Sequence, residues 1–424
     1  MMLSKLGVGA LVGSMAAWGT LGCGATTSPD DDEDVVTVPA PLARSGERLS
    51  AMAYQAGDAA QFRHFHDELY GFDCEFAIDH ERTTRCFPMK TATVVYLDPS
   101  CRTPAARSEG LKTGDWVVGS GTQACPGELG TRGAPYVVGE QIYAESIVGS
   151  EGYEVYESTG TGACQLAYGQ SKTNAEVRAL VERSPRELVQ GRIDSVDTNQ
   201  GLRVQKLVAE DGAEANFGVV LADGTACHLE RDGRCVGVPS LDGGRTCREP
   251  ATAAAASGAR LVRVGSDALH LELFELKGGG AAADAVFQFP AGENGKFLTN
   301  EGTSCSVWDA ADGSLRCAAV DEIAEAGSWS DSNCTKRLYR LYDDRAGSQL
   351  SPAAVSELRY FRRDFDQDGH YQIVAVGSLK AHEGPAFTLQ DQECVPTGTN
   401  QQLLALDQDL GIESLPLVRS TRLE

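Results

Sequence analysis

The sequence lacks the short motifs that mark most common catalytic and cofactor sites. It contains no GxSxG elbow, no P-loop and no HExxH pair, and its 13 cysteines form no CxxC or CxxCH pattern. It also lacks a basic stripe, because 60 acidic residues oppose 37 basic residues and give a formal net charge of -23. A surface this acidic repels nucleic-acid phosphates and anionic lipid headgroups, so we expect no nucleic-acid partner.

The sequence also has few aromatic residues and few stretches with helical periodicity. Aromatics make up 7% of the chain, whereas its 47 glycines favour many tight turns. Short apolar runs bounded by turn residues predict an all-β fold whose antiparallel sheets stack or close on themselves. One segment departs from this pattern. Asn174 can cap a helix that ends at Pro185, so we predict one short helix near residues 174–188.

The first residues have the pattern of an export signal. Lys5 precedes an apolar run from Leu6 to Trp18, which is too short and too rich in glycine for a membrane-spanning helix. Gly22-Cys23 resembles the cleavage site of bacterial lipoproteins, in which a small residue precedes the cysteine that carries the lipid. The resemblance implies a signal peptide over residues 1–22 and lipidation of Cys23. The alternative is a plain secretory signal with a chance cysteine.

The residues that follow Cys23 predict a tether. Residues 23–40 include the acidic run Asp30–Asp34 and should extend as a self-repelling linker. The β body would then occupy residues 41–424. Resemblance to the lipoprotein sorting pattern implies, through Gly24, that the lipid holds the protein in the outer membrane of the cell envelope. The membrane is therefore one predicted partner, reached through the lipid anchor.

The cysteines predict disulfide bonds. Removing Cys23 from the 13 cysteines leaves an even twelve, which is typical of an oxidised framework in an exported chain. Three close pairs bracket a turn signal near the middle of the interval, such as Asp232-Gly233. Cysteines that face each other directly across such a hairpin are close enough to bond. The predicted disulfides are Cys74–Cys86, Cys227–Cys235 and Cys305–Cys317; the other six cysteines stay unassigned.

Two phrases recur along the body and predict a repetitive architecture. Pro41-Leu-Ala-Arg44-Ser45 near the start matches Pro416-Leu-Val-Arg419-Ser420 near the end, and a three-cysteine phrase occurs three times. Propeller blades of about 40–50 residues would fit roughly six into the body, and the two chain ends would complete one shared blade. A six-bladed β-propeller is the favoured fold. Tandem β-sandwich domains with a boundary near residues 170–195 are the alternative.

The three-cysteine phrase resembles a group of myxobacterial lipoproteins of unknown function. The shared features are an arginine before the second cysteine of each hairpin and an Asp-containing turn before the third. The arginine–cysteine pairs are Arg85-Cys86, Arg234-Cys235 and Arg316-Cys317, and the later turns contain Asp98, Asp242 and Asp331. The resemblance implies an envelope lipoprotein and adds no activity, because the group has none assigned.

Alternating carboxylates before a glycine can converge on a hard cation, and one such phrase predicts a calcium site. Its candidate ligands are Asp364, Asp366, Asp368, His370 and Gln372. The phrase resembles the calcium loops of FG-GAP propeller repeats, which usually have an aspartate where Gln372 stands. The alternative is a solvated Asp-Gly turn of a hairpin.

A second candidate metal site is a histidine pair. On a strand, His64 and His66 would share a face and could share a zinc ion. No third ligand is evident in the sequence. The alternative is two histidines on an exposed strand face.

These observations favour an envelope-anchored lipoprotein that acts as a binding or structural module. The lipid tether, the disulfides and repeated β units without catalytic motifs support this hypothesis, and a protein or a glycan is the expected partner. The alternative is a secreted hydrolase of glycan or peptidoglycan, which would need two carboxylates about 5–10 Å apart in a deep cleft.

Overall fold

The computed structural model describes most of the chain from residue 43 onward. The described residues are 43–107, 110–119, 129–143, 155–159, 163–168, 177–230, 232–237, 240–241, 247–248, 255–256, 258–266, 268–290, 296–299, 302–318, 321–341, 359–365, 371–390, 393–397 and 403–424. The described residues belong to one compact unit, Pro39–Glu424. The proposed signal peptide, Cys23 and the acidic linker lie outside the described residues.

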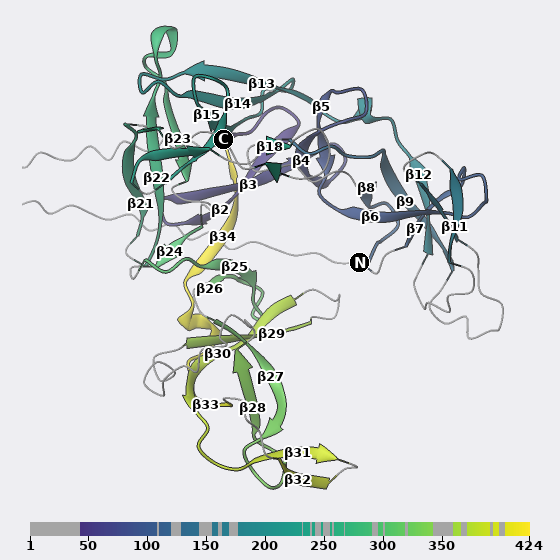
Figure 1. Cartoon of the computed structure of the whole chain (residues 1–424), viewed down its shortest axis with the longest axis vertical. Helices are drawn as coiled ribbons and strands as arrows, with labels where there is room; N and C mark the ends of the chain where they lie inside the picture. The colour runs from purple at the N-terminus through teal and green to yellow at the C-terminus, as the bar shows by residue number, and fades with distance from the viewer. Residues whose placement is uncertain are drawn as a thin grey trace, which may run out of the picture. The chain divides into compact units, whose positions relative to one another are not determined.

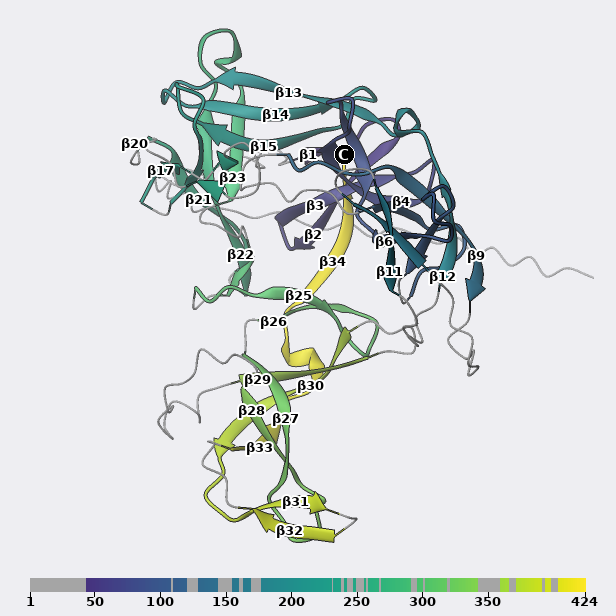
Figure 2. The same cartoon turned by 45° about the vertical axis from the view of Figure 1, so that its right-hand side comes forward.

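The described residues form an all-β protein, which confirms the predicted fold class. Every regular element in this part of the chain is a β-strand or a short 3-10 turn. None of the described residues belongs to a helix long and apolar enough to cross a bilayer. Hydrogen bonds join the strands into one 14-stranded sheet, two 7-stranded sheets, one 4-stranded sheet and one 2-stranded sheet (Figures 1 and 2).

Three copies of one strand pattern follow each other along the chain. In each unit, two antiparallel strands lead to a disulfide-bonded hairpin. The strands of unit I are β2 (Leu49–Ala56), β3 (Ala59–Asp67), β4 (Phe72–Ile78) and β5 (Thr84–Pro88); those of unit II are β14 (Arg203–Ala209), β15 (Glu214–Val220), β16 (Ala226–Leu229) and β17 (Arg234–Gly237); those of unit III are β21 (Arg260–Gly265), β22 (Leu269–Lys277), β25 (Ser306–Asp309) and β26 (Leu315–Ala318). Unit III also contains β23 (Val286–Pro290) and β24 (Leu298–Thr299), which both pair with β22.

The second hairpin strand of each unit pairs with a linking strand. These pairs join β5 to β13 (Gln190–Asp197), β17 to β20 (Ala255–Ala256) and β26 to β34 (Leu417–Leu423). β13 also pairs with β14 of unit II, and β34 pairs with β2 of unit I. The C-terminal strand β34 therefore has the same role in unit I as β13 has in unit II, because each pairs with the first strand of its unit (Figure 1). The N-terminal strand β1 (Ala43–Arg44) pairs with β15 in the same sheet, so both ends of the described body meet there.

The backbone of the three hairpins is also shared. Gly71, Gly224 and Gly302 each stand three residues before the first cysteine, with φ of 68°, 90° and 76°. Glycine adopts this left-handed conformation without a steric cost. A second left-handed residue closes each hairpin turn: Arg82, Gly233 or Gly313. The recurring cysteines thus belong to a longer structural repeat, which also includes the strands and turns around them.

Units I and III each contain a closed five-stranded barrel between the hairpin and the linking strand. Barrel I is formed by β6 (Thr91–Tyr96), β7 (Pro104–Arg107), β12 (Val177–Glu182), β9 (Pro135–Tyr143) and β8 (Trp116–Gly119), in this order, and β8 pairs back with β6. Barrel III is formed by β27 (Asp321–Trp329), β28 (Arg337–Leu341), β33 (Leu404–Asp409), β30 (Tyr371–Ala381) and β29 (Arg359–Phe365), and β29 pairs back with β27. In unit II, the described residues between the hairpin and the linking strand form only one pair of strands, β18 (Ser240–Leu241) and β19 (Cys247–Arg248).

The six-bladed propeller is not found. The second hairpin strand of each unit is hydrogen-bonded to the next linking strand, so units I and II share one continuous sheet and do not form separate blades. The segments inserted in units I and III close into barrels. In each barrel the strands at the two edges of the sheet pair with each other, so no edge is left open. Sheets do pack face to face: Phe274 and Phe287 of the 4-stranded sheet pack against Val204 and Cys235. This face-to-face packing of two sheets is a feature that the described residues share with the predicted β-sandwich alternative.

The predicted helix near residues 174–188 is wrong. Asn174 lies outside the described residues, but the segment that follows it is strand β12, which closes barrel I by pairing with β7 and β9. Val177 and Leu180 are buried there, and the pairing of β12 with β9 shifts register between them, so their three-residue spacing does not require a helix. Tertiary pairing has overridden a local helical pattern. Pro185 begins only a 3-10 turn, Pro185–Glu187, which Ser184 caps.

Candidate functional site: two equivalent hairpin platforms

Each barrel is extended by a two-stranded hairpin that pairs with its first strand. In barrel I, β10 (Val155–Ser158) pairs with β11 (Cys164–Tyr168) and with β6. In barrel III, β31 (Ala386–Gln390) pairs with β32 (Glu393–Thr397) and with β27. The two barrels therefore have the same set of strand pairings, including one parallel pair each, β6 with β8 and β27 with β29. The same structural element occurs twice in the chain.

A disulfide ties each hairpin to the turn that follows the first barrel strand. Cys101 bonds Cys164, and Cys334 bonds Cys394, across sequence separations of 63 and 60 residues. Cys101 and Cys334 both have left-handed backbones, with φ of 52° and 51°. A non-glycine residue rarely adopts this conformation, so its occurrence at both equivalent cysteines shows that the two turns have the same design.

An aspartate carboxylate holds each of these turns. Asp98 accepts hydrogen bonds from the backbone N–H groups of Arg102 (2.9 Å) and Thr103 (2.6 Å). Desolvation acts to raise the pKa of Asp98, but these hydrogen bonds outweigh it and hold the pKa below its ordinary value. Asp331 accepts from the Thr335 hydroxyl and from the N–H of Lys336 (2.9 Å), and its pKa is lowered in the same way. Both carboxylates thus rigidify the turns.

A row of three apolar side chains crosses each hairpin at the same register. In barrel I, Tyr96 stands opposite Tyr156, which stands opposite Leu166. In barrel III, Trp329 stands opposite Phe387, which stands opposite Pro396. The four aromatic residues are partly exposed and the two outer residues are exposed, with Leu166 at 45%. We call these rows platform I (Tyr96, Tyr156 and Leu166) and platform III (Trp329, Phe387 and Pro396).

Equivalent apolar clusters lie beneath the two hairpins. Under the platform I hairpin, Val155 packs with Ala105 and Val177. Under the platform III hairpin, Ala386 packs with Leu338 and Leu403. In each case the residue before the central aromatic faces inward, so the alternation of a β-strand places the aromatic on the opposite face. The platforms are therefore outer surfaces of hairpins whose inner surfaces are fixed by packing.

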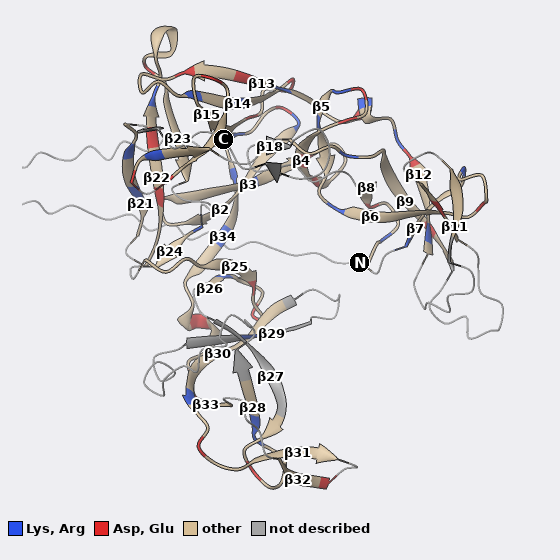
Figure 3. Cartoon of the chain, viewed as in Figure 1, with Lys and Arg blue, Asp and Glu red and all other residues tan. Residues whose placement is uncertain are grey.

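Few charges lie on the platform hairpins. Strands β10 and β11 contain one charged residue, Glu157, and strands β31 and β32 contain one, Glu393 (Figure 3). Elsewhere charges of both signs alternate along the sheets, as in the cross-strand pairs Arg260–Glu275 and Arg263–Glu272. In a chain with a net charge of -23, the platform hairpins thus carry few charges, as do strands such as β8 and β23.

The platforms could not be recognised from the sequence. The two aromatic residues of each row are about 60 residues apart in the sequence, and each strand contributes only one residue to the row. A usable signal did exist: Tyr96-Leu-Asp98 and Trp329-Ser-Asp331 both place an aromatic two residues before the turn aspartate and five before a cysteine. Without the pairing of the later hairpin, that signal identifies only half of each row.

The predicted calcium phrase lies on the β29–β30 hairpin of barrel III. Asp364 and Gln372 are register partners near the ends of the two strands. Asp366, Asp368 and His370 lie outside the described residues. The calcium site therefore stays a prediction, and a fluorescence titration with terbium would test it.

The predicted histidine pair shares a face and contacts a third residue, Asp73. His64 Nε2 lies 3.2 Å and His66 Nδ1 2.8 Å from the same Asp73 Oδ1 atom. Both rings are thus engaged in contacts with one carboxylate. Among the described residues, no group of three or more potential ligands is arranged to hold a metal ion. The predicted zinc site gains no support.

Contacts with the two histidines make the stability of unit I depend on pH in the acid range. The hydrogen bond with His64, together with the one from His66, lowers the pKa of Asp73 from 3.8 to about 2, against partial burial. A carboxylate with a lowered pKa stabilises the fold above its ordinary pKa, and this contribution is lost as the pH falls toward about 2. We therefore expect Asp73→Asn to lower the urea midpoint at pH 6, with a difference from wild type that shrinks below pH 4. A difference that grows as the pH falls would contradict this assignment.

Ser50, His66 and Asp73 lie side by side on β2, β3 and β4 in the order of a hydrolase triad. The Ser50 hydroxyl, however, donates its hydrogen bond to Glu68, and Ser50 is 1% exposed. A nucleophile needs both a base within reach and access to substrate. This row therefore does not form a hydrolytic site. Comparison with known proteins adds no second candidate: no family model, curated protein or solved structure matches the chain.

Proposed function

We propose that this chain is a lipoprotein of the cell envelope whose body acts as a binding module with two equivalent sites. The Cys23 lipid would hold it in the outer membrane, and residues 23–40 would separate the body from the bilayer. The proposed sites are platforms I and III. The body would act by binding and not by catalysis.

One observation carries this proposal: the barrel, its hairpin, the disulfide and the apolar row occur together twice. The core beneath the two hairpins differs in sequence, yet both rows keep aromatic residues at their first two positions. Partly exposed aromatic residues on a rigid support are typical of binding surfaces. Their presence at the same register in both barrels supports a shared binding role.

The anchor is tested by the intact mass of the protein purified from its native membrane. We expect residues 1–22 to be absent, acyl mass to be present, and reduction to add about 12 mass units, two hydrogens for each of six disulfides. The described residues account for five bonds, and Cys125 lies outside the described residues. A chain that retains residues 1–22 without acyl mass would refute the lipoprotein assignment.

A matched variant separates lipidation from export. Cys23→Ser removes the lipid acceptor and leaves the export segment and the body unchanged. We expect this protein to partition into the aqueous phase of a detergent extraction, whereas wild type enters the detergent phase. Equal partition of the two proteins, with residues 1–22 absent from both by intact mass, would show that Cys23 is not the anchor.

A further inference from the structure

We propose that platforms I and III bind an uncharged polysaccharide, with the sugar rings stacked on the aromatic side chains. This inference rests on the proposed binding function and specifies its ligand. The surface consists of two rows: Tyr96 of β6 with Tyr156 and Leu166 of its hairpin, and Trp329 of β27 with Phe387 and Pro396 of the other. Three arguments lead to this ligand: the shape of the rows, their charge and their duplication.

The shape of each row suits a chain of sugar rings. Neighbouring strands lie about 4.8 Å apart, so a row across three strands spans about 10 Å, roughly the length of a disaccharide. Sugar rings present flat C–H faces, which pack against the electron-rich faces of aromatic rings. Leu166 and Pro396 are exposed at the outer edge of each row, so a longer chain can continue past the hairpin. A linear glycan is therefore accommodated without a deep pocket.

The charge of the platforms selects against ionic ligands. The four hairpin strands contain no lysine or arginine, and their two charged residues are Glu157 and Glu393. These four strands offer an anionic polymer no cation, and the net charge of -23 would repel it; Arg337 of β28, which stands opposite Trp329, already has an interaction partner of its own. A protein partner would usually exploit charge complementarity and arginine anchors, which the hairpins lack. An uncharged glycan needs neither.

The duplication suits a ligand that repeats itself. A polysaccharide offers the same units along its length, so two equivalent platforms can bind one polymer and reinforce each other. The disulfides Cys101–Cys164 and Cys334–Cys394 fix each hairpin to its turn before any ligand arrives. Such preorganisation reduces the entropy lost on binding. A single weak stacking site would thus become a useful binder when present twice.

The test counts binding sites with short uncharged oligosaccharides. Calorimetric titration of the full processed chain with cellohexaose or chitohexaose should give two sites per chain for at least one of them. Tyr156→Leu and Phe387→Leu each preserve apolar volume but remove a flat ring, so each should leave one site. The double variant should leave none and should no longer be depleted by insoluble cellulose or chitin. Alginate, an anionic glycan, should not bind.

A matched control excludes a general effect of losing an aromatic residue. Tyr54 is a partly exposed aromatic on β2 that belongs to neither platform, so Tyr54→Leu should retain two sites. Urea unfolding of each variant checks that it is folded. Wild type that binds neither hexasaccharide, or a folded double variant that still binds both sites, overturns the inference. If binding fails while the acylated, processed chain is found in the membrane, the anchor stands and only the ligand assignment falls.

Discussion

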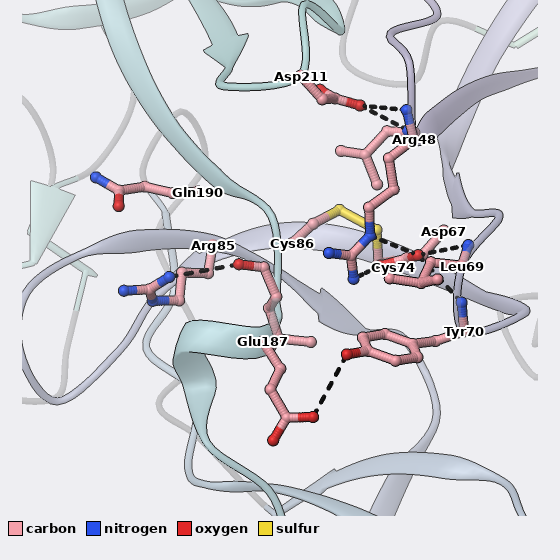
Figure 4. A network of polar contacts seen from close by, with 12 residues as sticks. Arg48, Asp67, Leu69, Tyr70, Cys74, Arg85, Cys86, Glu187, Gln190 and Asp211 are labelled. Carbon is pink, nitrogen blue, oxygen red and sulfur yellow. Dashed lines mark hydrogen bonds and ion pairs between the residues drawn. A yellow bond between two sulfur atoms is a disulfide. The ribbon is translucent and has the colours of Figure 1, made fainter.

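Replacing Asp67 with alanine should lower the free energy of unfolding by about 3–5 kcal/mol, because it leaves the Arg48 charge without its partner. The Asp67 side chain is fully buried, and its carboxylate receives Arg48 Nε at 2.9 Å and Nη2 at 2.6 Å. The same carboxylate accepts the backbone N–H groups of Leu69 (3.0 Å) and Tyr70 (3.3 Å) (Figure 4). One substitution therefore removes four charge-assisted hydrogen bonds to the carboxylate, two of them from the guanidinium.

The effect should extend beyond unit I, because this ion pair connects several parts of the body. The Arg48 guanidinium lies 4.8 Å from the ring centre of Tyr70, which stacks on Trp116 of barrel I at 4.6 Å. The backbone N–H of Arg48 donates to Asp211 Oδ2 of unit II at 3.0 Å (Figure 4). Loss of Asp67 would therefore loosen the segment before β2, the barrel contact and the unit II contact together.

An exposed ion pair provides the control for Asp67. Arg192 Nε lies 3.0 Å from Asp194 Oδ1 on β13, where both side chains are largely exposed to solvent. Asp194→Ala should change the free energy of unfolding by less than about 1 kcal/mol. Urea denaturation followed by circular dichroism measures both variants. Equal losses for Asp67→Ala and Asp194→Ala would show that the buried pair does not support the fold as described.

The hairpin disulfides were predictable because their signal is local. A turn residue near the middle of each cysteine interval fixes the hairpin, and the hairpin brings its cysteines together. The register differs in one detail from the direct pairing expected: Phe76, not Cys74, stands opposite Cys86. The bond thus joins diagonal positions, with a Cα separation of 5.3 Å that still suits a disulfide. Short-range turn chemistry decides the pairing even when the exact register is uncertain.

The barrels and the platforms were not predictable because they depend on distant pairings. Cys101 and Cys164 are 63 residues apart, and no turn signal between them indicates that they meet. The strand that closes barrel I, β12, even has an apolar pattern that favours a helix. Its strand conformation depends on β7 and β9, which come from elsewhere in the chain. Contacts of this kind are set by topology, and local sequence patterns do not report them.

The C-terminal strand should be essential to the body, because β34 is the only described strand that pairs with both β2 of unit I and β26 of unit III. Val418 of β34 is 2% exposed and packs in a cluster with Leu271, Cys305 and Cys317. Val418→Asp would bury a charge without a partner and should cost several kcal/mol. The variant should unfold at a much lower urea concentration than wild type.

The adjacent residue of the same strand is the matched control. Leu417 points to the other face and is 46% exposed, so Leu417→Asp introduces the same charge into solvent and should change stability by no more than about 0.5 kcal/mol. Both variants keep the strand's backbone hydrogen bonds, so a difference between them measures burial of the Val418 face alone. A large gap would mean that β34 (Leu417–Leu423) holds units I and III together. Equal midpoints would mean that the body folds without closure by its C-terminal strand.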